Sequence, residues 1–329
     1  MIRKIKIFPI IVFLILFWNI FVNAQEKLEK TGINLLKPSV VETIDKQVAQ
    51  IVSNYSYIKI ALVRKSKIVL SKAYGTSGLE DNGVYCSVSK PVTSMILMQL
   101  VEDGKIKSIE DNIWDYSVKY KNCMPEKYKN SSLTFKHLLT HSSGIPHNNE
   151  PLWNGDKLNL KFEPGSQFLY STPGYGVIGD IIERVTGKSF NDLLKEYIGE
   201  PAGAGSFGGY DSFITPGAFV YSTIEDMALF SIGVMDNIYI SSEILYNTVL
   251  KDHFDDENIN YGLGWGIRNQ DSEELTASHS GSNGTPKSFL IIKPRKKQSV
   301  SILALKNTSQ GNSDLRDLAD DLLLMLSDK

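Results

Sequence analysis

The chain has 329 residues, of which 42% are hydrophobic, and its formal net charge at pH 7 is −2. A chain of this length and apolar content can bury a substantial core, in one large domain or in two intimately joined lobes. The mildly acidic balance, without a basic block interleaved with aromatic residues, argues against a nucleic-acid-binding protein. Two cysteines, Cys86 and Cys123, are too few for a disulfide framework, and the sequence leaves open whether they form one bridge.

Residues 1–24 have the three-part layout of a secretory signal. A basic start and an apolar stretch over residues 7–22 precede Ala24, and polar residues follow. We expect cleavage after Ala24, which would make the mature protein secreted or periplasmic. The alternative is an uncleaved segment that holds the chain at a membrane, but one proline and one asparagine interrupt the apolar stretch. Residues 25–38 are polar, and we predict that they form a flexible lead-in.

Both ends of the mature chain have sequence patterns that predict strands together with a helix. After a helical stripe that begins near Ser39, the patterns over 58–63 and 67–70 predict two strands joined by a polar hairpin turn. The final third returns to strands and closes with an amphipathic helix. Its predicted strands cover Tyr261–Ile267, Ser288–Ile292 and Val300–Leu305, and the helix places Leu315, Leu318, Leu322 and Leu326 at core spacing.

The middle of the chain is mainly helical with loops. We therefore predict an α+β fold in which an antiparallel sheet is flanked by terminal helices and interrupted by an all-α insertion. In this division a single domain spans 39–329, with an α/β lobe over 39–86 and 256–329 and a helical lobe over 87–255. A crevice between two lobes is a common place for a functional site.

Ser87 and Lys90 stand at the start of an apolar run with helical spacing. Side chains three residues apart on a helix are neighbours, so local structure alone brings this hydroxyl and amine within reach of each other. Ser-x-x-Lys is an arrangement in which a nearby lysine activates a serine nucleophile. A helix N-terminus adds a partial positive charge and free backbone N–H groups. The alternative interpretation is an exposed helix start, with the serine as cap and the lysine as a solvated charge.

His137 and His141 are four residues apart, which on one helical face is compatible with metal ligation. No Glu follows His137 to complete a zincin motif, and no third ligand is evident. We therefore predict packing and loop-fixing hydrogen bonds for both, and we expect neither metal nor cofactor. Further on, two Pro-Gly turns bracket a short aromatic segment that carries Tyr170, which by default is a packing residue.

Taken in chain order, these motifs resemble those of the serine β-lactamase-like hydrolases, above all class C β-lactamases, D-Ala-D-Ala carboxypeptidases and related esterases. The resemblance covers almost the whole mature chain. It rests on Ser87–Lys90, His137–Gly144, Phe162–Gly174, Pro216–Asp226 and His279–Gly281. It implies a β-lactamase/penicillin-binding-protein-like fold and assigns catalysis to Ser87, Lys90 and Tyr170.

The resemblance also implies a division of roles. Ser87 is the expected nucleophile, Lys90 orients it and supplies positive charge, and Tyr170 is the expected general base. A tyrosine that works as phenolate near pH 7 needs a pKa about three units below its reference value near 10, which corresponds to roughly 4 kcal/mol. An adjacent Lys⁺ can supply energy of that order. If a Tyr170→Phe variant keeps near-wild-type rates, the base is another group, and Lys90 itself, deprotonated by desolvation, is the first candidate. The expected oxyanion hole consists of the backbone N–H groups of Ser87 and Ser282.

The predicted substrate-binding residues are Thr172, His279, Gly281 and Ser282, and two of them depart from the family's pattern. Thr172 stands where Tyr-x-Asn is usual, so an amide that helps hold the acyl side chain and the lysine is replaced by a hydroxyl. His279 stands where β-lactamases tend to carry Lys, so a permanent charge for the β-lactam carboxylate is lost. Both changes favour an esterase or a peptidase over an efficient β-lactamase.

The sequence therefore predicts a serine hydrolase that forms an acyl-enzyme on an ester or amide bond of a small-molecule or peptide substrate. The first alternative is a D-Ala-D-Ala carboxypeptidase or β-lactamase that acts on peptidoglycan or β-lactams. The second is a catalytically weak protein that binds peptidoglycan peptides without turnover.

Overall fold

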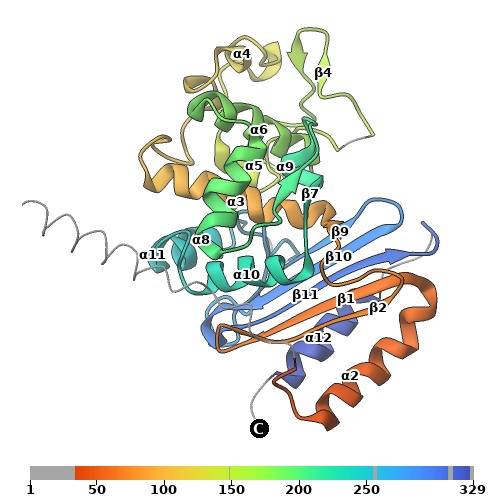
Figure 1. Cartoon of the computed structure of the whole chain (residues 1–329). Helices are drawn as coiled ribbons and strands as arrows, with labels where there is room; N and C mark the ends of the chain where they lie inside the picture. The colour runs from red at the N-terminus through yellow and green to blue at the C-terminus, as the bar shows by residue number, and fades with distance from the viewer. Residues whose placement is uncertain (1–33, 148, 255–257, 310–313, 327–329) are drawn as a thin grey trace, which may run out of the picture.

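The computed structural model describes residues 34–147, 149–254, 258–309 and 314–326 (Figure 1). The predicted signal segment, 1–24, and most of the predicted lead-in lie outside the described residues. Within the described ranges, no helix is both long enough and apolar enough to span a membrane.

A six-stranded antiparallel sheet has the order β2-β1-β11-β10-β9-β8. Strands from the two ends of the chain meet in it, because β1 pairs with β11 along almost its whole length. The strands are β1 (Tyr55–Arg64), β2 (Lys67–Gly75), β8 (Gly266–Arg268), β9 (Thr276–Ser282), β10 (Pro286–Lys293) and β11 (Gln298–Lys306). The sheet confirms the predicted fold class, although the strand pattern over 261–267 yields only the short strand β8.

One face of this sheet, here called the outer face, is covered by the terminal helices α2 (Pro38–Ile51) and α12 (Leu315–Met325) (Figure 1). Alternation along β1 explains why they pack there, since Ile58, Ile60 and Leu62 all lie in the apolar cluster formed with these helices. Both helices are amphipathic, and they place their apolar stripes on the sheet. The predicted terminal helices are therefore confirmed.

The other face of the sheet, here called the inner face, is turned toward the helical middle of the chain. Helix α10 (Ile224–Met235) lies directly on it and contacts β1, β2 and β11. Helix α3 (Ser89–Glu102) is buried around almost its whole circumference, and its buried residues include Lys90 and Thr93 besides the apolar ones. Helix α6 (Thr172–Thr186) packs against α3, and the short helix α9 (Thr215–Ala218) contacts both.

Shorter elements complete the middle of the chain. The helices are α4 (Val118–Lys121), α5 (Phe135–Leu139), α7 (Phe190–Leu193), α8 (Glu200–Ala202) and α11 (Ser242–Ile244), with π-helical turns η5 (Leu194–Gly199) and η6 (Leu245–Val249). The 3₁₀ turns are η1 (Val52–Asn54), η2 (Cys86–Val88), η3 (Ile113–Asp115), η4 (Glu126–Tyr128) and η7 (Pro294–Lys296). Strands β3 (Gly83–Val84), β7 (Val220–Ser222) and β6 (Gly208–Gly209) form a small second sheet, and β4 (Trp153–Asn154) pairs with β5 (Lys157–Leu158).

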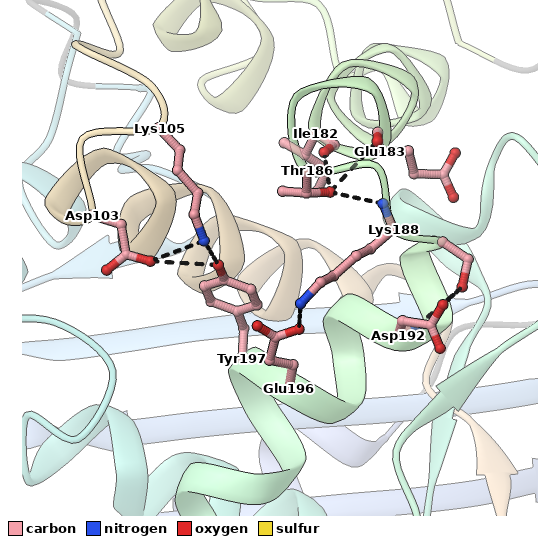
Figure 2. Close-up of polar contacts among 10 residues, drawn as sticks. Asp103, Lys105, Ile182, Glu183, Thr186, Lys188, Asp192, Glu196 and Tyr197 are labelled. Carbon is pink, nitrogen blue, oxygen red and sulfur yellow. Dashed lines mark hydrogen bonds and ion pairs between the residues drawn. The ribbon is translucent and has the colours of Figure 1, made fainter.

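Polar side chains tie the helical region together at its surface (Figure 2). Lys105, just after α3, contacts Tyr197 of η5, and Lys188 pairs with Glu196 of the same turn. Helix α6 ends at Gly187, whose φ of 69° is the left-handed conformation typical of a helix C-terminus. Exposed ion pairs of this kind contribute little to stability.

Candidate active site

Ser87 and Lys90 lie on one continuous turn, because η2 runs directly into α3. The Lys90 Nζ atom is 3.1 Å from Ser87 Oγ. Ser87 is half-buried, whereas Lys90 is completely buried. The structure thus brings together the two groups that the Ser-x-x-Lys spacing predicts to be neighbours.

The turn that carries Ser87 packs against strand β9. Cys86 has a φ of 47°, which is uncommon for a residue with a side chain. The Tyr85 carbonyl oxygen accepts a hydrogen bond from the Ser288 hydroxyl at 2.6 Å. A Cβ atom at Gly281 would lie 2.4 Å from that same oxygen, so only glycine allows β9 to approach this closely. Gly281 therefore acts on the site through its lack of a side chain.

The backbone of Ser282 is turned toward the free edge of β9. The Asn283 N–H donates to Pro286 O at 3.2 Å, which makes Asn283 and Pro286 a hydrogen-bonded pair of the hairpin. Hydrogen-bonded and non-hydrogen-bonded pairs alternate, so the Ser282–Lys287 pair is non-hydrogen-bonded and the Ser282 N–H points away from β10. Strand β8 pairs with β9 only as far as Ser278, and η2 lies against β9. The predicted oxyanion donor thus points away from β10, and the turn that carries Ser87 lies against the same strand.

Three elements meet at the Lys90 amine. Besides Ser87, Nζ contacts the Gly217 carbonyl oxygen of α9 at 2.7 Å and Thr172 Oγ1 at the start of α6 at 3.2 Å. Thr93 fixes α9 in place by donating to Pro216 O at 2.6 Å. Sequence reasoning missed the role of Gly217, because a backbone carbonyl leaves no signature in residue type.

The environment of Lys90 favours its neutral form. Burial lowers the pKa of Lys90 well below its ordinary value. The three contacts of Nζ are to neutral oxygens. A neutral amine has two N–H donors and one lone pair, so it can donate to Gly217 and Thr172 and accept from the Ser87 hydroxyl.

Tyr170 lies beside this pair, with its ring centroid 4.6 Å from Lys90 Nζ. Burial raises the pKa of Tyr170, and a hydrogen bond with Ser87 opposes the rise without cancelling it. The expectation that a cationic Lys90 would lower the pKa of Tyr170 is therefore wrong. The physical reason is that the same burial disfavours the charged form of both groups.

His279 is buried, and both of its ring nitrogens have partners within the protein. Nδ1 is 2.8 Å from Ser280 O and Nε2 is 3.0 Å from the Tyr261 hydroxyl. A carbonyl oxygen only accepts, so Nδ1 carries the proton and Nε2 accepts from Tyr261. Burial lowers the pKa of His279 to about 3, so the ring is neutral at physiological pH. Sequence reasoning did not single out Tyr261, since no local pattern links it to His279.

His137 and His141, weighed above as metal ligands, have different partners. His137 Nδ1 accepts from the Thr134 N–H at 3.3 Å and completes the cap of α5, whereas His141 Nδ1 accepts from the Ser171 N–H at 3.0 Å. The described part of the chain contains no group of three or more His, Cys, Asp or Glu residues placed to hold a metal ion.

The question of a disulfide bridge, which the sequence leaves open, is answered by the structure. Cys86 and Cys123 are both free. Burial raises the pKa of the Cys86 thiol to about 12, so this neighbour of Ser87 is a neutral thiol at physiological pH.

A Ser-x-x-Lys turn beside the edge of an antiparallel strand is an arrangement used by acyl-transferring serine hydrolases. The family model described as Beta-lactamase matches residues 48–325. The chain therefore belongs to the beta-lactamase family of serine hydrolases.

Curated relatives share about a quarter of their residues with this chain. Penicillin-binding protein 4* of Bacillus subtilis (strain 168) is 25% identical over 263 residues, which cover 62% of this chain and 56% of that protein. Protein flp of Staphylococcus aureus (strain N315) is 25% identical over 304 residues, covering 76% of this chain and 59% of that protein. The chain thus spans less than three fifths of the length of these relatives.

Solved structures share the fold. The octameric penicillin-binding protein homologue from Pyrococcus abyssi superimposes with a TM-score of 0.74 at 22% identity, over 86% of this chain and 77% of that one. A beta-lactamase/D-alanine carboxypeptidase from Yersinia pestis gives a TM-score of 0.68 at 18% identity, over 88% of this chain and 99% of that one.

Proposed function

We propose that this protein hydrolyses ester or amide bonds through an acyl-enzyme at Ser87, as an esterase or peptidase rather than as an efficient β-lactamase. The observation that carries the proposal is the buried amine of Lys90, 3.1 Å from Ser87 Oγ and surrounded by neutral oxygens. An amine kept neutral by desolvation can act as a general base near physiological pH.

In the proposed acylation step, Ser87 Oγ attacks the substrate carbonyl carbon while its proton moves to the neutral Lys90 Nζ. The carbonyl oxygen gains the negative charge, and the backbone N–H groups of Ser87 and Ser282 stabilise it. Lys90 is then an ammonium ion held against the carbonyl oxygen of Gly217.

When the tetrahedral intermediate collapses, the bond from the carbonyl carbon to the leaving group breaks and the leaving group takes a proton. We assign that proton to the Tyr170 hydroxyl, which Lys90 reprotonates. The raised pKa of Tyr170 suits a hydroxyl that stays protonated between turnovers and donates only when charge develops on the leaving group. Water then attacks the acyl-enzyme along the reverse proton path and frees Ser87.

Two positions support a preference away from β-lactams. Thr172 offers one hydroxyl, and that hydroxyl already contacts Lys90. His279 is neutral, and both of its ring nitrogens are bonded within the protein, so it brings no positive charge to a substrate carboxylate. A site without hydrogen-bonding partners for a substrate group does not favour a substrate that carries this group over one that lacks it.

Peptidoglycan-directed peptidase activity is the second candidate. The names of the Bacillus subtilis and Yersinia pestis proteins, a penicillin-binding protein and a carboxypeptidase, favour it. We further propose that the mature protein works in the periplasm or outside the cell, because residues 1–24 have the layout of a secretory signal.

The deciding experiment compares kcat/KM of the purified mature protein on a p-nitrophenyl ester, nitrocefin and a D-Ala-D-Ala peptide. We expect the ester to exceed nitrocefin. Equal or greater efficiency on nitrocefin would contradict the proposed preference, and turnover of the peptide alone would favour the second candidate. A fluorophosphonate probe separates both from a binding-only protein, which would not be labelled at Ser87.

A further inference from the structure

His141 contacts the chain on both sides of Tyr170. Its carbonyl oxygen accepts from the Leu169 N–H at 2.7 Å, and its Nδ1 accepts from the Ser171 N–H at 3.0 Å. The imidazole also lies against the tyrosine, with ring centroids 4.2 Å apart. One residue therefore fixes the peptides before and after Tyr170 and supports its ring.

His141 is itself held rigidly. It is completely buried and has a φ of 60°, a conformation in which His and Asn are more common than most residues. The rings of Tyr261, Tyr175 and Phe168 surround the imidazole at centroid distances of 5.1, 5.4 and 5.8 Å. The imidazole is thus enclosed by aromatic side chains and has little room to turn.

The protonation state of His141 suits a fixed acceptor. Burial lowers the pKa of His141 well below its ordinary value. The neutral ring accepts at Nδ1, so its proton is on Nε2, which has no hydrogen-bond partner in the described part of the chain. The ring can therefore act as a fixed hydrogen-bond acceptor for the Ser171 N–H.

The bond to Ser171 also sets the start of α6. The Ser171 hydroxyl caps that helix by accepting from the Gly174 N–H at 3.1 Å. The next residue is Thr172, which contacts Lys90. A shift at Ser171 would therefore move the hydroxyls of both Tyr170 and Thr172 relative to Lys90.

From this geometry we propose that His141 is a positioning residue, which holds the Tyr170 hydroxyl in register with Ser87 and Lys90 through its Nδ1 bond to Ser171. The inference rests on the proposed acyl-enzyme function and adds a specific residue to it. A misplacement of about 1 Å in a catalytic group can cost about 10²-fold in rate, so a loss of that size is the expected effect.

The test uses two substitutions that separate the ring from the acceptor. H141F keeps an aromatic ring but has no acceptor, whereas H141N keeps an acceptor near Nδ1 and tolerates the positive φ. On a p-nitrophenyl ester we expect H141F to lower kcat about 10²-fold with KM changed less than about threefold, and H141N to stay within about fivefold of wild type. H137A is the matched control, because it removes a half-buried histidine one turn earlier that caps α5 and has no contact with Ser171, and its kcat should be near wild type.

A double-mutant cycle with Y170F distinguishes positioning from general damage. If His141 acts through Tyr170, H141F should cost much less in a Y170F background than in the wild type, with only the part that acts through Thr172 remaining. If H141F does not fold, H141M makes the same comparison, since methionine lacks the nitrogen acceptor and adapts to irregular cavities. An H141F enzyme with wild-type kcat, or equal losses in both backgrounds, would overturn the inference. An inert wild-type protein that a fluorophosphonate does not label at Ser87 would instead overturn the proposed function.

Discussion

The two faces of the main sheet have different chemistry. On the outer face, β1 meets α2 and α12 through aliphatic side chains such as Ile44, Ile60 and Leu322. The inner side of the molecule also has a large apolar core, but polar groups are fully buried within it, including Lys59, Lys90 and His141. Burying a polar group costs free energy unless its hydrogen bonds to water are fully replaced within the protein. Aliphatic packing, in contrast, stabilises the fold.

This difference indicates where stability and function can be separated. Substitutions on the outer face should lower the free energy of unfolding and leave the turnover of the folded protein unchanged. Substitutions around Lys90 should remove turnover with little loss of stability, and some should even stabilise the protein. Natural enzymes often show this trade-off, in which residues needed for activity lower the stability of the fold.

Ser87→Ala should give the largest effect on activity. Without a nucleophile, kcat should fall on the order of 10⁴–10⁶-fold, while the melting temperature stays within about 2 °C of wild type because Ser87 is only half-buried. Ester kinetics and thermal unfolding measure both. Ser94→Ala is the matched control on helix α3, directly after the turn that carries Ser87, since its hydroxyl has no partner in the described part of the chain, and it should be fully active.

Lys90→Met should lower kcat/KM by roughly 10²–10⁴-fold, the usual effect of losing a general base. The lowered pKa of Lys90 also predicts a pH dependence. In the wild type, kcat/KM should fall as the pH drops through that lowered pKa, because only the neutral amine accepts the Ser87 proton. This acidic limb should vanish in the variant. Lys59→Met replaces another fully buried lysine and should keep both the rate and the limb.

Stability should respond to the same substitution with a defined sign. The pKa of Lys90 is lower in the folded protein than in the unfolded chain, so unfolding takes up a proton below the reference value of about 10.4. The wild type should therefore gain stability relative to Lys90→Met as the pH rises toward that value. A difference between the two melting temperatures that does not change between pH 6 and 9 would mean that Lys90 is charged in the folded state.

Leu322→Ala tests the outer face. Removing this completely buried side chain of α12 should cost about 2–5 kcal/mol in the free energy of unfolding, measured by urea denaturation. At a temperature where the variant is folded, kcat should match wild type, since α12 and Ser87 lie on opposite sides of the sheet. A large loss of kcat in a folded variant would show that the two faces are coupled. Ile44→Val, a smaller deletion on the buried face of α2, should cost about 0.5–1.5 kcal/mol.

The smallest expected effect concerns specificity. Thr172→Asn should raise the acylation rate of nitrocefin about two- to tenfold relative to the ester, the gain from roughly one additional hydrogen bond. Thr172→Ser keeps the contact with Lys90 and should leave the ratio unchanged. An unchanged ratio in Thr172→Asn would indicate that position 172 does not set the preference.

Local features of this molecule were predictable from the sequence. The Ser87–Lys90 pair depends only on helical spacing, and the amphipathic patterns of the terminal helices and the alternation in β1 depend only on the nearest elements. The features that were missed depend on packing between distant segments. The Gly217 carbonyl and the Tyr261 hydroxyl reach their partners only when α9 meets α3 and when residue 261 approaches β9.

The error about Tyr170 has the same origin. Sequence reasoning treated Lys90 as a cation that lowers the pKa of the neighbouring Tyr170. The completely buried position of Lys90 follows from the packing of α3, α6 and α9 around it, and burial lowers the pKa of Lys90 and raises the pKa of Tyr170.

The central position of β1 has a consequence for biosynthesis. The β1–β2 hairpin is made early, but the other edge of β1 pairs with β11, which leaves the ribosome roughly 10–50 s later at usual elongation rates. Until then that edge is open and can pair with strands of other chains. Strand β9, which carries Ser282, is also synthesised late, because more than half of the chain length separates Ser282 from Ser87. A nascent chain therefore holds the nucleophile long before the oxyanion strand exists, so hydrolytic activity should appear only when synthesis has passed β11.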